Sequence, residues 1–152
     1  MPSISIPSPI GRLTIEEADE QIVAIRWADE LASNANLSNG SALLVEAARQ
    51  LAAYFDGTLS HFELPLAPAG SPFESRVWAA MQQIPYGETR SYGDLAAAIG
   101  SAPRAVGRAC GKNPIPIVIP CHRVLAKGGL GGYSGAGGLA TKQRLLALEG
   151  AV

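Results

Sequence analysis

The stretch SYGDLAAAIGSAPRAVGRACG, residues 91–111, determines the expected fold of the second half of the chain. Ser91, followed three residues later by Asp94, is a capping-box pattern, so we predict a short helix that ends near Gly100. Pro103 favours the start of another helix that runs to the end of the stretch. Two short helices joined by a tight turn outline a helix-turn-helix, which is a frequent DNA-binding motif. Helix pairs of this size are common, so the outline alone leaves a purely structural role open.

The segment before this motif carries another helix start. In Ser71-Pro72-Phe73-Glu74, a capping serine precedes a proline at the first helical position, and glutamate follows three residues after the cap. We predict a helix from there to about Ile84, before the break Pro85-Tyr86-Gly87. Its expected buried side chains are Phe73, Val77, Trp78 and Met81.

The segment after the motif has a different character. Residues 114–119, Pro-Ile-Pro-Ile-Val-Ile, contain prolines that exclude a helix and β-branched residues that suit a buried segment. We therefore predict an extended, buried segment that leads to Cys121. A glycine-dense loop follows at residues 127–135, and an amphipathic pattern predicts a last helix from about Leu139 to Glu149.

The first part of the chain carries signals for strands as well as a helix. Alternating apolar residues on both sides of the polar turn Glu17-Ala18-Asp19-Glu20 predict a β-hairpin over residues 10–28. Helical spacing of apolar residues predicts a helix over residues 41–55, with Gly57 as its stop. Prolines and glycine between residues 65 and 72 indicate a connection between two lobes.

The 152 residues are 47% hydrophobic and 16% charged, which fits a globular protein and argues against disorder. We predict an α/β (α+β) fold with an N-terminal lobe at 1–70, built from a hairpin or sheet and a helix, and a mostly helical C-terminal lobe at 71–152. The first lobe has three basic and nine acidic residues, net −6, whereas the second has nine basic and four acidic, net +5. A basic half is expected where one face meets phosphates, although an accident of small numbers gives the same imbalance.

The sequence also indicates where the protein works. No apolar run approaches the roughly 20 residues that a membrane helix needs. The first residues lack the basic start and apolar stretch of a signal peptide. We therefore expect a cytoplasmic protein with no membrane partner.

Cys121 and its neighbour His122 are a candidate reactive pair. A thiol becomes a good nucleophile as a thiolate, and histidine is the usual activator. Neighbours on a regular strand point to opposite faces, so a direct pair requires a turn at this position or a bridging water. Glu149 is the candidate to orient the histidine. The pair alone leaves open an inert buried thiol beside a structural histidine, and a secreted chain would form a disulfide with Cys110.

Several motifs together resemble the active-site signature of a known family. They are Pro120-Cys121-His122-Arg123-Val124, Asn113-Pro114-Ile115-Pro116 before it, and Gly132-Tyr133-Ser134-Gly135 after it. The family is the O6-alkylguanine-DNA alkyltransferases, also called methylated-DNA–protein-cysteine methyltransferases. The resemblance covers roughly residues 71–150. The first lobe resembles the family's N-terminal domain only in its length and in its order of hairpin and helix.

The resemblance implies a DNA-repair protein that transfers the alkyl group of O6-alkylguanine in double-stranded DNA irreversibly to its own Cys121, in a single turnover. The second helix of the helix-turn-helix would enter the minor groove, and Arg104 would fill the gap left by the flipped guanine. We expect a monomer and no cofactor. The sequence leaves open the range of alkyl groups, the repair of O4-alkylthymine and cooperative binding along DNA.

The resemblance also implies roles for individual residues. His122 would take the thiol proton through water, and Glu149 would hold His122. Asn113 would brace the turn, and Tyr92 would donate a hydrogen bond to the base. The expected substrate-binding residues are Tyr133, Ser134, Val124, Gly135 and Lys142, with the role of Lys142 left open. The expected DNA-binding residues are Arg104, Ala105, Gly107, Arg108, Ser91 and Arg123.

Three positions depart from the family pattern. Gly137-Gly138 makes the loop before the last helix longer than the shortest family version, which puts the tolerance of bulky alkyl groups in doubt. The N-terminal cysteines that bind zinc in some members are absent, so we predict no metal. Cys110 stands where the family has an apolar side chain, and we interpret it as a packing residue.

Three other functions compete with this interpretation. A non-enzymatic damage binder keeps the pocket and lacks the cysteine, which is present here. A cysteine hydrolase needs an oxyanion hole and a water path, and no hydrolase signature surrounds Cys121. A plain helix-turn-helix regulator would not explain the run Pro120-Cys121-His122-Arg123.

Overall fold

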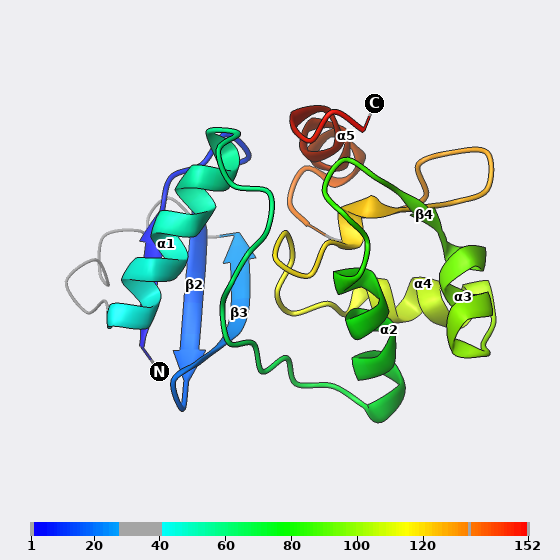
Figure 1. Ribbon diagram of the computed structural model, residues 1–152, viewed down its shortest axis with the longest axis horizontal. Helices are drawn as coiled ribbons and strands as arrows, with labels where there is room; N and C mark the ends of the chain where they lie inside the picture. The colour runs from blue at the N-terminus through cyan, green and yellow to red at the C-terminus, as the bar shows by residue number, and fades with distance from the viewer. Residues whose placement is uncertain (1, 28–40, 134, 152) are drawn as a thin grey trace. The chain divides into compact units, whose positions relative to one another are not determined.

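The computed structural model describes residues 2–27, 41–133 and 135–151. The chain divides into two compact units, Met1–Pro68 and Ala69–Val152. Figure 1 shows strands and one helix in the first unit and mostly helices in the second. The predicted α+β fold class is therefore confirmed.

The first unit is a three-stranded antiparallel sheet with one helix packed against it (Figure 1). Its strands are β1 (Ser3–Ile6), β2 (Leu13–Ala18) and β3 (Gln21–Trp27), in the order β1-β2-β3. Helix α1 (Ala42–Phe55) begins after the N-cap Ser41. The core is formed by apolar side chains of the strands and of α1, among them Leu13, Ile15, Ile22, Leu44 and Leu51.

The predicted hairpin and the predicted helix of the first unit are confirmed. Asp19 and Glu20, between β2 and β3, both have positive φ, 51° and 62°, as in the turns that suit two-residue hairpins. Strand β1 was not predicted, although its isoleucines alternate with serines. Its pairing with β2 is reinforced by the hydroxyls of Ser5 and Thr14, whose oxygens are 2.8 Å apart.

Three helices of the second unit pack on one another: α2 (Pro72–Gln82), α3 (Tyr92–Ile99) and α4 (Pro103–Gly111). Both predicted capping boxes are present, at the starts of α2 and α3. Helix α3 ends at Gly100 in the left-handed conformation, with φ 70°, and the chain passes directly into α4. The two helices and the tight turn predicted from residues 91–111 are therefore confirmed.

Side chains of α2 fasten the other two helices. The indole Nε1 of Trp78 donates a 2.9 Å hydrogen bond to the carbonyl of Ala109 in α4. The guanidinium of Arg76 donates to the carbonyl of Ile99 at the end of α3. Phe73 is only half-buried, contrary to the prediction, because it lies in the first turn of α2 at a shallow groove beside Arg108.

The prediction of an extended segment at residues 114–119 is wrong. The backbone turns back on itself, since the N–H of Ile119 donates to the carbonyl of Ile115 at 2.9 Å. Ile117, at the bend, has φ 75°. The prolines exclude a helix as expected, but they permit a tight turn equally well. The predicted burial is confirmed, because Ile115, Ile117 and Ile119 are fully buried.

The remaining elements complete the second unit. Strands β4 (Arg90–Ser91) and β5 (Val124–Leu125) pair in parallel, and the 3-10 turn η3 (Cys121–Arg123) precedes β5. Helix α5 (Gly138–Leu148) closes the chain within one residue of its predicted bounds, with Glu149 as its C-cap. Among the described residues, no helix has the length and apolar character needed to cross a membrane.

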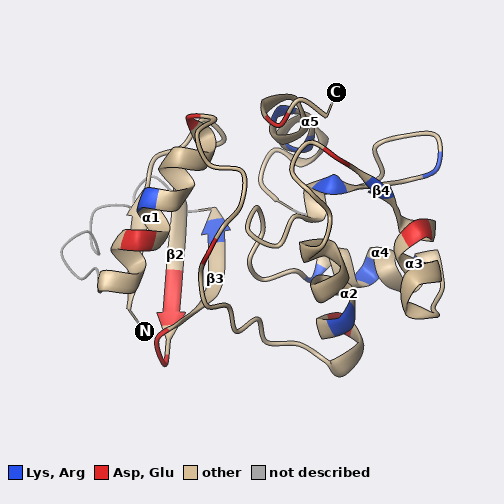
Figure 2. Cartoon of the chain, viewed as in Figure 1, with Lys and Arg blue, Asp and Glu red and all other residues tan. Residues whose placement is uncertain are grey.

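The charged side chains differ between the two units (Figure 2). Acidic residues described in the first unit come from β2, the turn after it, α1 and the segment that follows α1. Lys and Arg of the second unit come from α2, α4, α5 and the segment around β4 and β5. The basic half seen in the sequence is therefore also a basic structural unit.

Candidate active site

The turn at residues 113–119 places Cys121. Asn113 braces this turn from both sides, because its Nδ2 donates to the carbonyl of Ile119 at 2.8 Å and its Oδ1 accepts from the N–H of Ile115 at 2.9 Å. A β-branched residue at positive φ, such as Ile117, costs about 1–3 kcal/mol and persists only where its surroundings fix it. The bracing predicted for Asn113 has a structural basis in these two bonds.

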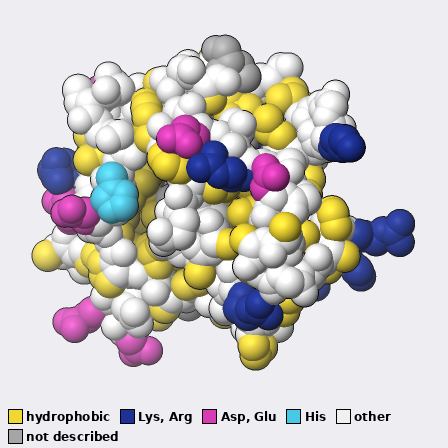
Figure 3. All heavy atoms as spheres, turned by 45° about the vertical axis from the view of Figure 1, so that its right-hand side comes forward, with side chains coloured by type: hydrophobic (Ala, Val, Ile, Leu, Met, Phe, Trp, Pro, Cys, Tyr) yellow, Lys and Arg dark blue, Asp and Glu magenta, His cyan; other side chains and the backbone are white. Residues whose placement is uncertain are grey.

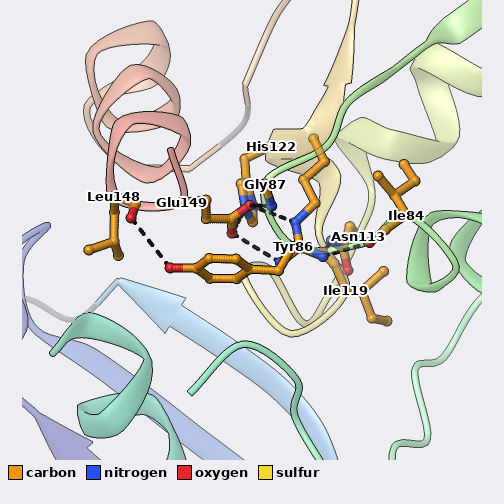
Figure 4. A network of polar contacts seen from close by, with 9 residues as sticks. Ile84, Tyr86, Gly87, Asn113, Ile119, His122, Leu148 and Glu149 are labelled. Carbon is orange, nitrogen blue, oxygen red and sulfur yellow. Dashed lines mark hydrogen bonds and ion pairs between the residues drawn. The ribbon is translucent and has the colours of Figure 1, made fainter. Parts of the chain in front are cut away.

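The 3-10 turn η3 resolves the geometric difficulty posed by adjacent cysteine and histidine residues. Cys121 lines a pocket, whereas His122 is fully buried. The Nε2 of His122 lies 2.7 Å from Oε2 of Glu149, at the end of α5 (Figure 4). The turn therefore directs Cys121 to the pocket and the ring of His122 to Glu149.

The protonation of His122 follows from its partners. A carboxylate only accepts hydrogen bonds, so a neutral ring carries its hydrogen on Nε2 and leaves Nδ1 as the acceptor. Among the described residues, Nδ1 has no hydrogen-bond partner, although it is buried. Burial lowers the pKa of His122, and this outweighs the opposing effect of Glu149. The ring is therefore neutral at pH 7 and can accept a proton at Nδ1.

Cys121 starts as a thiol. Burial raises the pKa of the Cys121 thiol, and the side chains of Asn113 and Lys142 oppose this only in part. A thiol with a raised pKa needs a base in order to become a nucleophile. The neutral ring of His122, next to it on η3, is the candidate base.

Cys121 opens into a pocket of about 470 Å³ in the second unit. This volume lies within the range typical of small-molecule sites. Two aromatic rings, two cysteines and three glycines form its wall: Tyr92, Tyr133, Cys110, Cys121, Gly107, Gly111 and Gly132. A flat ring can enter between such residues, because glycines let it approach the backbone closely. Gly111 and Cys110 were not predicted as wall residues, although both lie on α4 close to Gly107.

The glycine-dense loop that carries Tyr133 is fixed by Lys142. The ammonium of this buried lysine donates to the carbonyls of Val124, at 2.6 Å, and of Leu130 and Gly132, at 2.5 and 3.0 Å. The three protons are thus used by backbone carbonyls, so the expectation that Lys142 binds substrate is contradicted. Lys142 instead fixes the wall of the pocket.

The other expected substrate-binding residues differ in whether they line the pocket. Tyr133 lines the pocket, and burial raises the pKa of its phenol. The carbonyl of Val124 already accepts a hydrogen bond from Lys142. Ser134 lies outside the described residues. Gly135 does not line the pocket, and its carbonyl accepts from the N–H of Gly138 at 3.1 Å.

Tyr92 connects the pocket to the helix-turn-helix. It begins α3 and lines the pocket, and its ring fills the space where a Cβ on Gly131 would come within 2.8 Å. Gly131 also has φ 72°, so only glycine fits this position well. Burial raises the pKa of Tyr92, which keeps its hydroxyl as a hydrogen-bond donor at pH 7.

The expected DNA-binding residues of α4 lie where a ligand can reach them. Arg104 and Arg108 are exposed, whereas Ala105 and Gly107 are half-buried. In Figure 3, Lys and Arg side chains project at several places, and one near the centre lies between two acidic side chains. Ser91 is half-buried, and its hydroxyl accepts from the N–H of Asp94 at 2.9 Å as the cap of α3.

Arg123 does not lie where the sequence analysis expected it. It is buried, and its guanidinium donates to both carboxylate oxygens of Glu149 and to the carbonyl of Ile84. A side chain bound in this way cannot reach DNA, so that prediction is wrong. Its position in a basic lobe gave no hint of the buried partners.

The turn after α2 also reaches this cluster, a link that the sequence analysis missed. The hydroxyl of Tyr86 donates to the carbonyl of Leu148 at 3.3 Å, and the N–H of Gly87 lies 3.5 Å from Oε1 of Glu149 (Figure 4). Gly87 has φ 82°, and a Cβ there would approach the carbonyl of Glu149 to 3.2 Å. The motif Pro85-Tyr86-Gly87 thus fixes the end of α5.

Among the described residues, no group of three or more His, Cys, Asp or Glu could hold a metal ion.

Both parts of the chain match models of one family. Residues 3–68 match the 6-O-methylguanine DNA methyltransferase, ribonuclease-like domain, and residues 72–151 match the DNA binding domain of the same family. The methylated-DNA–protein-cysteine methyltransferase of Mycolicibacterium paratuberculosis is 49% identical over 150 residues, covering 95% of this chain and 90% of the relative. The corresponding protein of Methanosarcina acetivorans is 56% identical over 108 residues, covering 69% and 68%.

A solved structure agrees with these matches. The crystal structure of Mycobacterium tuberculosis OGT in complex with DNA has a TM-score of 0.87 and 42% sequence identity, covering 99% of this chain and 94% of that one. Sequence and fold therefore agree over both units, and the chain belongs to the 6-O-methylguanine DNA methyltransferase family.

Proposed function

We propose that Cys121 accepts the alkyl group from O6-alkylguanine in double-stranded DNA, irreversibly and once per molecule. The observation that carries this proposal is the arrangement of the buried ring of His122. Glu149 holds its Nε2 at 2.7 Å, while its Nδ1 has no hydrogen-bond partner among the described residues. Cys121, adjacent on η3, lines a pocket that can hold a flat base.

In this proposal, helix α4 binds the DNA. Its exposed arginines, Arg104 and Arg108, would lie against the duplex, while half-buried Ala105 and Gly107 permit close approach. An atom inside a base stack is out of reach, so the damaged guanine must be flipped out, at a cost of a few kcal/mol. Arg104, at the start of α4, is the residue that would fill the gap.

The flipped base would enter the pocket between Tyr92 and Tyr133. Glycine at positions 107, 111 and 132 leaves backbone and open space at the wall instead of side chains. The hydroxyl of Tyr92, kept protonated by its raised pKa, would donate to the base as negative charge develops on it.

The chemical step moves one proton and one alkyl group. The proton of the Cys121 thiol passes to Nδ1 of His122, directly or through one water, and Glu149 stabilises the imidazolium that forms. The thiolate then attacks the alkyl carbon in line. The new C–S bond forms as the C–O6 bond breaks, and the electron pair leaves with guanine, which then takes up a proton. The thioether product is stable, so Cys121 is consumed.

The proposed chemistry also suggests a cellular location and an oligomeric state. The acceptor must be a free thiol, and both cysteines are free in the structure. The cytoplasm keeps thiols reduced, so we place the reaction there. One Cys121 per chain suffices, and we propose that a monomer carries out the reaction.

Mass spectrometry tests the proposal directly. The protein is incubated with duplex DNA that contains O6-methylguanine, and the peptide with Cys121 is weighed. We expect a gain of one methyl group per molecule, without turnover. An unmodified peptide with the lesion still bound would instead indicate a damage binder. The same assay with O4-methylthymine or bulkier O6-alkyl groups would define the substrate range.

A further inference from the structure

Arg123 is a buried charged residue that the proposed transfer does not use. Its Nε and Nη2 donate to the two oxygens of Glu149, at 2.8 and 3.0 Å, and its Nη1 donates to the carbonyl of Ile84 at 2.7 Å. Its guanidinium carbon lies 5.8 Å from the centre of the Tyr86 ring. The side chain of Arg123 is 8% exposed and that of Glu149 is fully buried. Such a fork-to-fork pair is both strong and geometrically specific.

One carboxylate therefore serves two partners. Oε2 of Glu149 faces both Nε2 of His122, at 2.7 Å, and Nη2 of Arg123, at 3.0 Å. Arginine stays protonated in proteins, whereas histidine changes its charge near neutral pH. The charge of Glu149 is thus balanced by Arg123 before His122 gains any proton.

We propose that Arg123 is a positioning residue that keeps His122 neutral, and so able to accept a proton, by neutralising the carboxylate that holds its ring. This proposal rests on the proposed function, in which His122 is the base for Cys121. Arg123 is not among the residues that line the pocket, and its side chain bonds Glu149 and the carbonyl of Ile84, so it acts through Glu149.

The charges that act on His122 come from two elements. Burial lowers the pKa of His122, Glu149 at the end of α5 raises it, and Arg123 of η3 and Lys142 of α5 lower it. Without Arg123, an unbalanced buried carboxylate would stand 2.7 Å from the ring and stabilise the imidazolium. A ring that is already protonated cannot take the thiol proton. Loss of Arg123 should therefore slow transfer most strongly at neutral and acidic pH.

The direct test is an NMR titration of His122 in the wild type and in Arg123→Met. The chain has two histidines, and the resonance of the exposed His61 in the first unit serves as the internal control. We expect the titration midpoint of His122 to rise by about one pH unit or more in the variant. An unchanged midpoint in the folded variant would overturn the proposal.

Two further comparisons separate charge from fold. Arg144→Met removes an exposed positive charge from the same helix as Lys142, and it should leave the His122 midpoint in place. If Arg123→Met does not fold, Arg123→Lys is compared with Arg123→Gln. The lysine keeps the positive charge beside Glu149 and should hold the midpoint near that of the wild type, whereas the uncharged glutamine should raise it. Equal midpoints in these two variants would also overturn the proposal.

The rate of methyl transfer from O6-methylguanine in duplex DNA to Cys121 provides a second measurement. In Arg123→Met, the fall in rate at acidic pH should begin about one pH unit higher than in the wild type, with recovery at alkaline pH. A merely structural role would lower the rate equally at every pH and would overturn the proposal. If wild-type Cys121 takes up no methyl group at any pH, the proposed function fails, while the NMR titration still decides the effect of Arg123 on His122.

Discussion

Cys110 and Cys121 line the same pocket, but their surroundings differ. Cys110 lies on α4, where its Sγ is 3.5 Å from Sδ of Met81 in α2. Cys121 lies on η3 next to His122, whose ring is held by Glu149 at 2.7 Å. Burial raises the pKa of both thiols, that of Cys110 to about 12. At neutral pH both residues are therefore thiols at rest.

The two cysteines thus differ in their neighbours more than in their own acidity. Cys110 has a thioether beside it, which cannot take a proton, whereas Cys121 is followed in the chain by His122, whose neutral imidazole can take one. A shared pocket gives both thiols access to the same ligand. We infer that the base that follows the cysteine in the chain decides which cysteine reacts, and four predictions test the comparison.

The largest expected effect is that of Cys121→Ser. A hydroxyl is a far weaker nucleophile than a thiolate, so methyl transfer from O6-methylguanine DNA should become undetectable by mass spectrometry. Binding to the damaged duplex should persist, as measured by fluorescence anisotropy. The matched variant Cys110→Ser should keep the transfer rate within about threefold of wild type, less than 1 kcal/mol in the barrier. A methyl group found on Cys110 in the Cys121→Ser protein would refute the comparison.

The next effect is that of His122→Gln, which retains an amide that can donate to Glu149 but removes the base. General-base catalysis contributes about 10²–10⁴-fold, so transfer at pH 7 should fall by at least about 100-fold. The deficit in transfer rate should shrink as the pH rises, because hydroxide then deprotonates the Cys121 thiol in place of His122. Single-turnover rates between pH 6 and pH 10 give the measurement. Parallel pH profiles in the two proteins would rule out His122 as the base.

Much of the fold could be predicted because its signals are local. The capping boxes at Ser71 and Ser91 need only residues three positions apart, and both are present in the structure. The hairpin over β2 and β3 follows from alternation along a few residues. The family signature around Cys121 also lies within a short stretch, so the amino-acid sequence alone is enough to propose Cys121 as the acceptor.

The wrong predictions concern positions whose conformation or partners depend on residues outside the local sequence pattern. The turn at residues 114–119 depends on Asn113 bonding Ile115 and Ile119, which a pattern of β-branched residues does not reveal. Arg123 looks like a DNA contact in a basic lobe, but Glu149, 26 residues further on, binds its guanidinium. The partners of Lys142 were missed for the same reason, because two of the carbonyls that bind its ammonium belong to a loop of irregular structure. Buried charges find partners that only the fold brings together.

A smaller effect is expected for Asn113→Ala, which leaves both thiols in place but releases the turn before Cys121. The substitution removes two hydrogen bonds, of 2.8 and 2.9 Å, each worth about 1 kcal/mol. Transfer should slow by about tenfold, or 1.4 kcal/mol in the barrier, because the sulfur is less well positioned. Asn113→Asp keeps the acceptor for Ile115 and loses the donor to Ile119, so its rate should be intermediate. Equal rates for Asn113→Ala and wild type would show that the turn does not position Cys121.

The smallest effect is expected for Cys110→Ala, which tests whether Cys110 is a packing residue. Removing a buried sulfur leaves a small void beside Met81 and should lower the free energy of unfolding by about 1 kcal/mol. Thermal unfolding should show a Tm lower by about 2–4 °C. Cys110→Val, which restores most of the volume, should recover part of this loss. The transfer rate should change little, because His122, the proposed base for Cys121, is untouched. A rate at least tenfold lower in Cys110→Ala than in Cys110→Val would instead mean that the side chain at position 110 also positions the bound guanine.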